Sequence, residues 1–346
     1  MSIANVPAST DLLIPKPAAG ETWASHTIHT HYFGFTVPQA NIGVFIYVRY
    51  QPVFNLCSGG VCIFQGMDNL RPLDCEHTNF IVTMPYPEVV GNVIETANGL
   101  RMEFIEPGKV MRLSYRSADG KTHFDVTQTA LTIALPRGHV MPGEDDDARP
   151  EQKPGGMEQF MHCVGELVVN GESHAVDCYP VRDRSWRQVR TEDEVLYPAV
   201  GWSPMYFGTR GDGLCFNQIG YELHEKAPWR GAFEMDESKP AHYFAWLVKN
   251  GELRNVPTVQ RRAFEYHPDL FVATKQEIIA IDDKGDRYRF YGEAIAMAQL
   301  PSWPNGLFFD SVYRWTDEQG NEAYCAYQEA WYHRYQRHMR RRLKSA

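Results

Sequence analysis

The chain has 346 residues, of which 43% are apolar and 22% charged, and its formal net charge is −9. These totals are typical of a folded globular protein that is long enough for two domains or one large β architecture. The acidic balance argues against nucleic-acid binding through a basic surface, and no apolar run approaches the ~18 residues of a membrane-spanning helix.

The N-terminal stretch MSIANVPASTDLLIPKPAAG has neither a basic region nor an apolar core, so it is not typical of a signal peptide. We therefore expect a cytoplasmic protein. Pro7, Pro15 and Pro17 predict that this stretch forms an extended arm. The seven cysteines include no C-x-x-C pair, which favours buried reduced thiols.

A histidine cluster, HTIHTH, follows the arm. If this segment is a strand, His29 and His31 point to the same face. Such a pair can bind zinc or iron when a third ligand is available, and the candidates are Asp74, Glu76 and His77. A role in lining a pocket or a polar surface is the more common one, and either histidine is a candidate general acid or base. We therefore predict no metal here.

Both halves of the chain predict β-structure. Runs rich in Val, Ile, Tyr and Phe alternate with hairpin signals such as the repeated NGE. The clearest runs occupy residues 42–50, 110–116, 123–135, 165–171, 287–298, 311–316 and 322–332. About 15 to 18 strands at roughly ten-residue spacing predict an all-β fold with two antiparallel lipocalin-like barrels or sandwiches in tandem.

The segment PGEDDDARPEQKPGG, residues 142–156, interrupts these runs. It holds three prolines, three glycines and four consecutive acidic residues, which is typical of a linker or a long surface loop. We place the domain boundary there, between an N-terminal β domain (1–145) that includes the arm and a C-terminal β domain (156–346). The basic end of the chain predicts a short closing helix or a frayed tail, and an anchor for acidic lipid headgroups is the alternative.

Several widespread catalytic motifs are missing from the sequence. It contains no G-x-G-x-x-G after a strand, no P-loop, no G-x-S-x-G and no H-E-x-x-H. This argues against nicotinamide, nucleotide triphosphate, serine-hydrolase and zincin chemistry. We expect a protein that works without a cofactor.

The stretch VRDRSWRQVR, residues 181–190, gathers four arginines around one Asp and one Trp. In a flat strand one face carries Arg182, Arg184, Trp186 and Arg190, with Asp183 and Arg187 on the other. In a helical turn, Asp183, Trp186 and Arg187 would cluster instead. In both arrangements an arginine can pair with Asp183 and lower the pKa of its carboxyl group. Asp183 is therefore predicted to stay ionised, as a base or as an anion that orients other groups.

The surrounding segment GELVVNGESHAVDCYPVRDRSW resembles tandem lipocalin-like proteins, in which an NGE turn leads to an Asp-His-Ser-Trp-Gly motif followed by Arg. This superfamily includes carotenoid 1,2-hydratases, AttH-like bacterial proteins, fungal lipocalin-like Diels–Alderases and a yeast survival-factor lipid-transfer protein. By this resemblance the signature positions are Asp183, Ser185, Trp186 and Arg190. Two positions depart from the pattern: Arg184 replaces the usual His, and Arg187 replaces a Gly, which puts the local backbone turn in question.

The resemblance and the 13% aromatic content imply a hydrophobic ligand held within or between the barrels. We expect a cofactor-independent lyase or isomerase of the hydratase or cyclase type, acting on an isoprenoid, a polyketide or another hydrophobic aromatic small molecule. His29, His31 or a tyrosine would donate the proton, and Asp183 would orient that donor or hold a polar end of the substrate. The predicted substrate-binding residues are Trp186, Arg182, Arg190, Trp202, Tyr206, Tyr32 and Trp23.

Two alternatives stay open at this point. A non-catalytic carrier of a lipid or small molecule would need the same apolar pocket without a proton donor. A metal-dependent enzyme would use His29 and His31. The sequence leaves the oligomeric state open.

Overall fold

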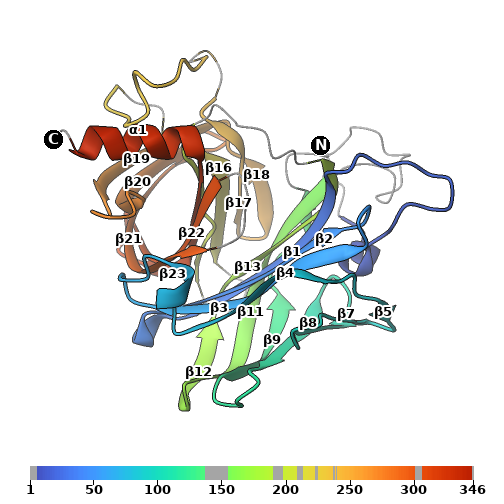
Figure 1. The fold of residues 1–346 in the computed structure, drawn as a ribbon. Coiled ribbons are helices and arrows are strands. Elements are labelled where there is room, and N and C mark those ends of the chain that lie inside the picture. Colours follow the sequence, from blue (N-terminus) through green and yellow to red (C-terminus); the bar gives the residue numbers. More distant parts are fainter. Residues whose placement is uncertain are drawn as a thin grey trace. The chain divides into compact units, whose positions relative to one another are not determined.

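The computed structural model describes residues 6–136, 155–189, 198–208, 213–222, 225–236, 238, 240–300 and 306–344. The chain divides into two compact units. The first comprises residues 1–37, 44–63 and 76–191, and the second comprises residues 38–43, 64–75 and 192–346. Each unit is built on one antiparallel sheet, which confirms the predicted all-β class (Figure 1).

The first sheet has 13 strands in the part of the chain that the structure describes. They are β1 (Thr27–Val37), β2 (Ile42–Gln51), β3 (Leu56–Gln65), β4 (His77–Pro85), β5 (Val89–Val90), β6 (Val93–Glu95), β7 (Arg101–Glu106), β8 (Val110–Arg116), β9 (His123–Ala130), β10 (Leu135–Pro136), β11 (Gly155–Val169), β12 (Glu172–Cys178) and β13 (Val181–Val189). The main order is β4-β3-β2-β1-β13-β11-β9-β8-β7-β6-β5. Short 3₁₀ turns lie at η1 (Ala8–Leu12), η2 (Pro38–Ala40) and η3 (Pro72–Asp74).

The second sheet has ten strands among the described residues, ordered β18-β17-β16-β14-β23-β22-β21-β20-β19, with β15 beside β16. Its strands are β14 (Val200–Trp202), β15 (Met205–Phe207), β16 (Leu214–Gly220), β17 (His242–Lys249), β18 (Glu252–Asn255), β19 (Thr258–Tyr266), β20 (Ala273–Ile281), β21 (Arg287–Leu300), β22 (Gly306–Asp317) and β23 (Glu322–Tyr332). The sheet curls, so that one face lines a common interior (Figure 1).

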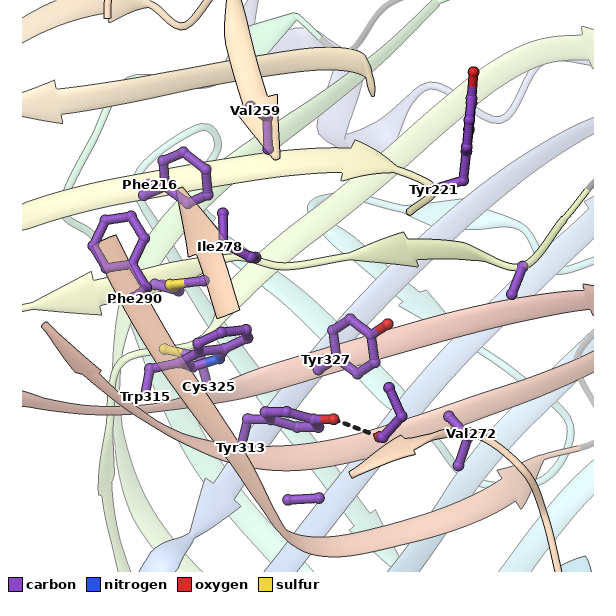
Figure 2. Close-up of a cluster of buried hydrophobic side chains, with 14 of the residues drawn as sticks. Phe216, Tyr221, Val259, Val272, Ile278, Phe290, Tyr313, Trp315, Cys325 and Tyr327 are labelled. Carbon is purple, nitrogen blue, oxygen red and sulfur yellow. Dashed lines mark hydrogen bonds between the residues drawn. The ribbon is translucent and has the colours of Figure 1, made fainter. Parts of the chain in front are cut away.

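Aromatic side chains fill the interior of the second unit. Figure 2 shows Phe216, Phe290, Trp315 and Tyr327 projecting from different strands into one buried cluster. They share this face because side chains alternate along a strand, and directly paired residues of neighbouring strands point the same way. The helix α1 (His333–Lys344), which matches the predicted closing helix, adds Tyr335 and Met339 to the cluster.

The predicted hairpin signals form turns where the sequence places them. Asn170 and Gly171 have φ values of 51° and 90° between β11 and β12, and Asn250 and Gly251 have 53° and 73° between β17 and β18. Two successive residues with positive φ define the two-residue turn that suits the twist of a hairpin, and Asn-Gly tolerates it best.

The division into units differs from the predicted boundary. Strands β11 to β13, residues 155–189, lie in the first unit, because β11 pairs with β9 and β13 pairs with β1. The first unit therefore extends to residue 191. An acidic segment rich in proline and glycine fits a connection between two strands of one sheet as well as a linker between domains. Most of the segment 142–156 lies outside the described residues.

Candidate functional site

The two predicted histidines lie side by side in the interior of the first unit. Strand β1 presents His29 and His31 to the same face, as expected, and both side chains are fully buried. Nδ1 of His29 accepts a hydrogen bond of 2.9 Å from the Arg187 backbone N–H, and its Nε2 lies 3.0 Å from the carbonyl oxygen of Pro15. Burial and the charge of Arg184 lower the pKa of His29 to about 3, so the ring is neutral at physiological pH.

His31 is equally engaged. Its Nδ1 lies 3.0 Å from the hydroxyl of Tyr50 and its Nε2 lies 3.0 Å from the carbonyl oxygen of Asp11, while the Arg184 guanidinium contacts the same ring. Burial and then Arg184 lower the pKa of His31 well below its usual value. Both histidines are therefore neutral groups that hold the N-terminal arm (residues 6–26), rather than proton donors near neutral pH.

The arginine-rich segment is a strand, and its two faces have different surroundings. Arg184 is directly paired with His31 on β1, so it points into the interior of the first unit. Asp183 is paired with Tyr32 and points to the opposite face. Asp183 therefore does not face His29 or His31, one of which it was predicted to orient. Arg182 forms an ion pair with Asp11 of the N-terminal arm, at 2.6 Å.

The backbone at Arg187 answers the question raised by the missing glycine. Arg187 has a φ of 50°, and the register of β1 against β13 shifts between Ile28 and Thr30, which marks a β-bulge. Arg187 therefore adopts the left-handed backbone conformation that glycine would adopt more readily. The Arg187 guanidinium covers the Trp23 ring at 4.0 Å from its centroid and lies 3.8 Å from Glu21, and these contacts compensate for the strained backbone.

Other predicted residues also have defined places. Trp186 is buried and packs with Ala134 and Met157 against Val6 and Leu13 of the arm. His77 was a possible third metal ligand, but its Nε2 lies 2.8 Å from the Tyr115 hydroxyl. The described residues contain no group of three His, Cys, Asp or Glu side chains arranged to hold a metal ion. Arg190 lies outside the described residues.

Trp202 and Tyr206 lie on the face of the second sheet that points away from its aromatic interior. On β15, Tyr206 alternates with Met205 and Phe207, which both belong to the interior cluster. Trp202 is directly paired with Gln328 of β23. We call this the outer face of the second sheet. Its paired side chains are nevertheless buried, with Trp202 6% and Tyr206 2% exposed.

A carboxyl group that the sequence did not predict lies on this outer face. Asp310 of β22 is directly paired with Gln328, so Trp202, Gln328 and Asp310 follow one another across three strands. Residues paired in this way have Cβ atoms about 5 Å apart. Asp310 is 3% exposed, and its Oδ1 has no hydrogen-bond partner among the described residues.

The environment of Asp310 favours its neutral form. Burial raises the pKa of this carboxyl group from its usual acidic range to about 8, against the opposing effects of Gln328 and of the Ser311 backbone N–H. At pH 7 Asp310 is therefore a protonated acid, able to donate a proton to a neighbouring molecule. The signal in the sequence was an Asp inside the run LFFDSVYRW, since Asp is rare in the middle of strands.

A second charged cluster lies in the interior of the second unit. Arg261 and Glu329 are both buried and form an ion pair at 3.2 Å. Tyr327 donates a 2.8 Å hydrogen bond to Glu329 and also contacts Arg261, while the Trp331 indole N–H donates to Glu329 at 3.0 Å. Each oxygen of Glu329 therefore has a donor, which is the arrangement expected of a structural ion pair.

Within the described residues, no helix combines the length and apolar character required to cross a membrane. The family described as "Domain of unknown function (DUF7064)" matches residues 21–333. No curated protein matches the chain.

Solved structures to which the chain is similar include kievitone hydratase from Nectria haematococca, with 13% identity, a TM-score of 0.49 and coverage of 97% of this chain and 95% of that one. A putative AttH from Nitrosomonas europaea has 10% identity, a TM-score of 0.46 and coverage of 92% and 98%. CghA has 10% identity, a TM-score of 0.48 and coverage of 92% and 94%.

Proposed function

We propose a function for this chain, which belongs to the DUF7064 family: it is a lyase or isomerase that works without a cofactor and moves a proton on a hydrophobic small molecule. The observation that supports this proposal is Asp310, a buried carboxyl group whose pKa is raised by burial, beside Gln328 and on the same face as Trp202 one strand further. A buried acid on a face that also carries aromatic side chains is suited to donate a proton where water is excluded.

The chemistry needs one group that first gives and then takes back a proton. Asp310 would protonate a double bond or a leaving hydroxyl group of the substrate, which leaves a carboxylate on the protein and a positive charge on the substrate. The electron-rich face of Trp202 would stabilise that charge. After protonation of a double bond, the proton would return to Asp310 either from another carbon of the substrate, which gives an isomer, or from a water molecule that adds to the cation, which gives a hydrate. After protonation of a hydroxyl group, water would leave, and return of a proton from the neighbouring carbon to Asp310 would give the dehydrated alkene.

The outer face offers the apolar surface that such a substrate requires. Besides Trp202 and Tyr206, it carries Trp246, which is paired with Asn217 of β16 and is 8% exposed. Three large aromatic side chains and a few polar groups on one buried face are typical of a site for a small molecule with a hydrophobic body and few polar substituents. An isoprenoid or polyketide skeleton fits that description.

Asp310→Asn tests the role of the acid directly. The native protein is purified, its bound small molecules are extracted into chloroform and identified by mass spectrometry, and turnover of the identified compound is measured. We expect Asp310→Asn to lower kcat by at least about 100-fold, the usual contribution of a general acid, with little change in binding. Ser311→Ala is the matched control, because Ser311 is the next residue on β22 and faces the interior. Full turnover by Asp310→Asn would exclude Asp310 as the proton donor.

The pH dependence of kcat/KM provides a second test. Because the acid acts only while it is protonated, activity should fall as the pH rises through about 8. A carrier remains the second candidate, favoured by the fact that an apolar buried face binds a ligand whether or not it reacts. Recovery of one unmodified compound in a 1:1 ratio with the protein, unchanged after incubation, would favour the carrier.

A further inference from the structure

We propose that the interior of the first unit contains a binding site for an aromatic carboxylate, and that the N-terminal arm occupies this site as an intramolecular ligand through Asp11. The inference goes beyond the proposed function, because every residue that carries it belongs to the first unit. It accounts for the histidines and arginines that the sequence singled out and that the proposed proton transfer does not use.

The carboxylate of Asp11 is bound as a ligand carboxylate would be. Arg182 reaches its two oxygens at 2.6 and 3.3 Å, and the backbone N–H of Gly108 donates at 2.6 Å. The Nε–H of Arg182 donates a 2.8 Å hydrogen bond to Oε1 of Gln159, which positions the guanidinium. Arg182, Gln159 and Gly108 all lie outside the arm, in β13, in β11 and after β7. The sheet thus forms a fork with two guanidinium donors and one backbone donor, the usual recognition of a carboxylate.

The same interior holds a second arginine, Arg184, whose contacts among the described residues include no anionic group. Arg184 is fully buried, and it contacts the Leu13 carbonyl oxygen and the His31 ring. Its Nε is buried and has no hydrogen-bond partner among the described residues. Since the histidines are neutral, the two arginines and the single carboxylate of Asp11 together carry a net charge of +1. The site can therefore accept a further anionic or strongly polar oxygen.

The arm is attached by bonds that a ligand could replace. Its carbonyl oxygens at Asp11, Leu13 and Pro15 meet the side chains of His31, Arg184 and His29, and that of Ile14 accepts a 3.0 Å bond from Tyr86. None of the described strand pairings includes residues 6–26. One backbone hydrogen bond, of 3.3 Å from the Val6 N–H to the Ala134 carbonyl oxygen, also attaches the arm. A segment held mainly by side-chain contacts can leave without breaking a sheet, unlike a paired strand.

The walls around the arginines indicate the body of the ligand. The His31 ring stacks on Phe33 at 5.6 Å between centroids, and Phe104 and Tyr50 lie at 5.8 and 5.5 Å from the same ring. Flat apolar surfaces beside a guanidinium fork favour a carboxylate that is joined to an aromatic or conjugated body.

Fluorescence titration with 1-pyrenebutyric acid tests the proposal, with its methyl ester as the uncharged control. Asp11→Asn removes the competing carboxylate of the arm but keeps its shape. We expect it to bind the acid at least about tenfold more tightly than the wild type, with no change for the ester. Replacing Arg182 as well, in the variant Asp11→Asn/Arg182→Gln, should abolish the gain.

A second variant keeps the test decisive if Asp11→Asn does not fold. Leu13→Ala should loosen the arm, because the Leu13 side chain packs against Trp186, Ala134 and Met157. The substitution changes no charged group of the site. The variant should also bind the acid more tightly than the wild type while the ester is unaffected. Equal binding of the acid by the wild type and by a folded Asp11→Asn or Leu13→Ala variant overturns the proposal, and so does an equal gain for the ester. Neither result bears on Asp310, which is tested by turnover.

Discussion

Replacing Asp310 by Asn should stabilise the protein, and the gain should depend on pH. The carboxyl group has a pKa of about 8 in the folded chain against 3.8 as its ordinary value. Between these values the folded state keeps a proton that the unfolded state has lost, so the stability of the wild type falls as the pH rises. Each pH unit in that window costs about 1.4 kcal/mol, which amounts to about 4 kcal/mol at pH 7 as an upper figure.

The assay is urea unfolding of both proteins, followed by tryptophan fluorescence at pH 5, 6, 7, 8 and 9. Asparagine has the same shape but does not ionise, so the difference in unfolding free energy between the variant and the wild type should grow from pH 5 to about pH 8 and then level off. Ser311→Ala, from the same strand, should show no such slope. A difference that is constant across this range would show that Asp310 is not held in its protonated form.

Three further predictions concern other parts of the fold. Glu329→Gln leaves Arg261 buried without its anion and should lower the unfolding free energy by about 3–5 kcal/mol, measured by urea unfolding, whereas the double change to Leu at both positions should cost less. Gly201→Ala places a Cβ 2.5 Å from Arg261 Nη1 and should lower the melting temperature, with a cost of about 1–3 kcal/mol; an unchanged melting temperature would contradict that close approach. Arg187→Ile, which combines a φ of 50° with a β-branched side chain and loses the Trp23 contact, should destabilise the protein by about 1–2 kcal/mol in thermal unfolding, and more than Arg187→Gly does.

The sequence predicted those features of the site that depend on neighbouring residues. Two-residue alternation placed His29 and His31 on one face, and it placed Arg182 and Arg184 together and apart from Asp183, as the structure confirms. Whether a histidine can donate a proton depends instead on its surroundings in space, which alternation along the sequence does not reveal. Burial in the folded unit and the charge of Arg184 lower the pKa of both rings and keep them neutral, although the hydrogen bonds to the carbonyl groups of the arm act in the opposite direction.

The domain boundary shows the same limit. Composition identified residues 142–156 as a connecting segment. It could not tell whether the strands before and after this segment belong to the same sheet. The pairing of β11 with β9 decides that they do, and it moves β11 to β13 into the first unit. Hydrogen bonds between strands that are distant in sequence carry no local signal.

The sequence alone determined the all-β class, the Asn-Gly hairpins and the faces on which the histidines and the arginines lie, because each of these follows from torsion preferences and alternation within a few residues. The tertiary structure alone decided which carboxyl groups matter. Asp11 meets Arg182 across 171 positions of sequence, and Asp310 keeps its proton because its neighbours on other strands exclude water from it. Charge pairing and desolvation depend on distance in space, and only the folded chain brings those groups together.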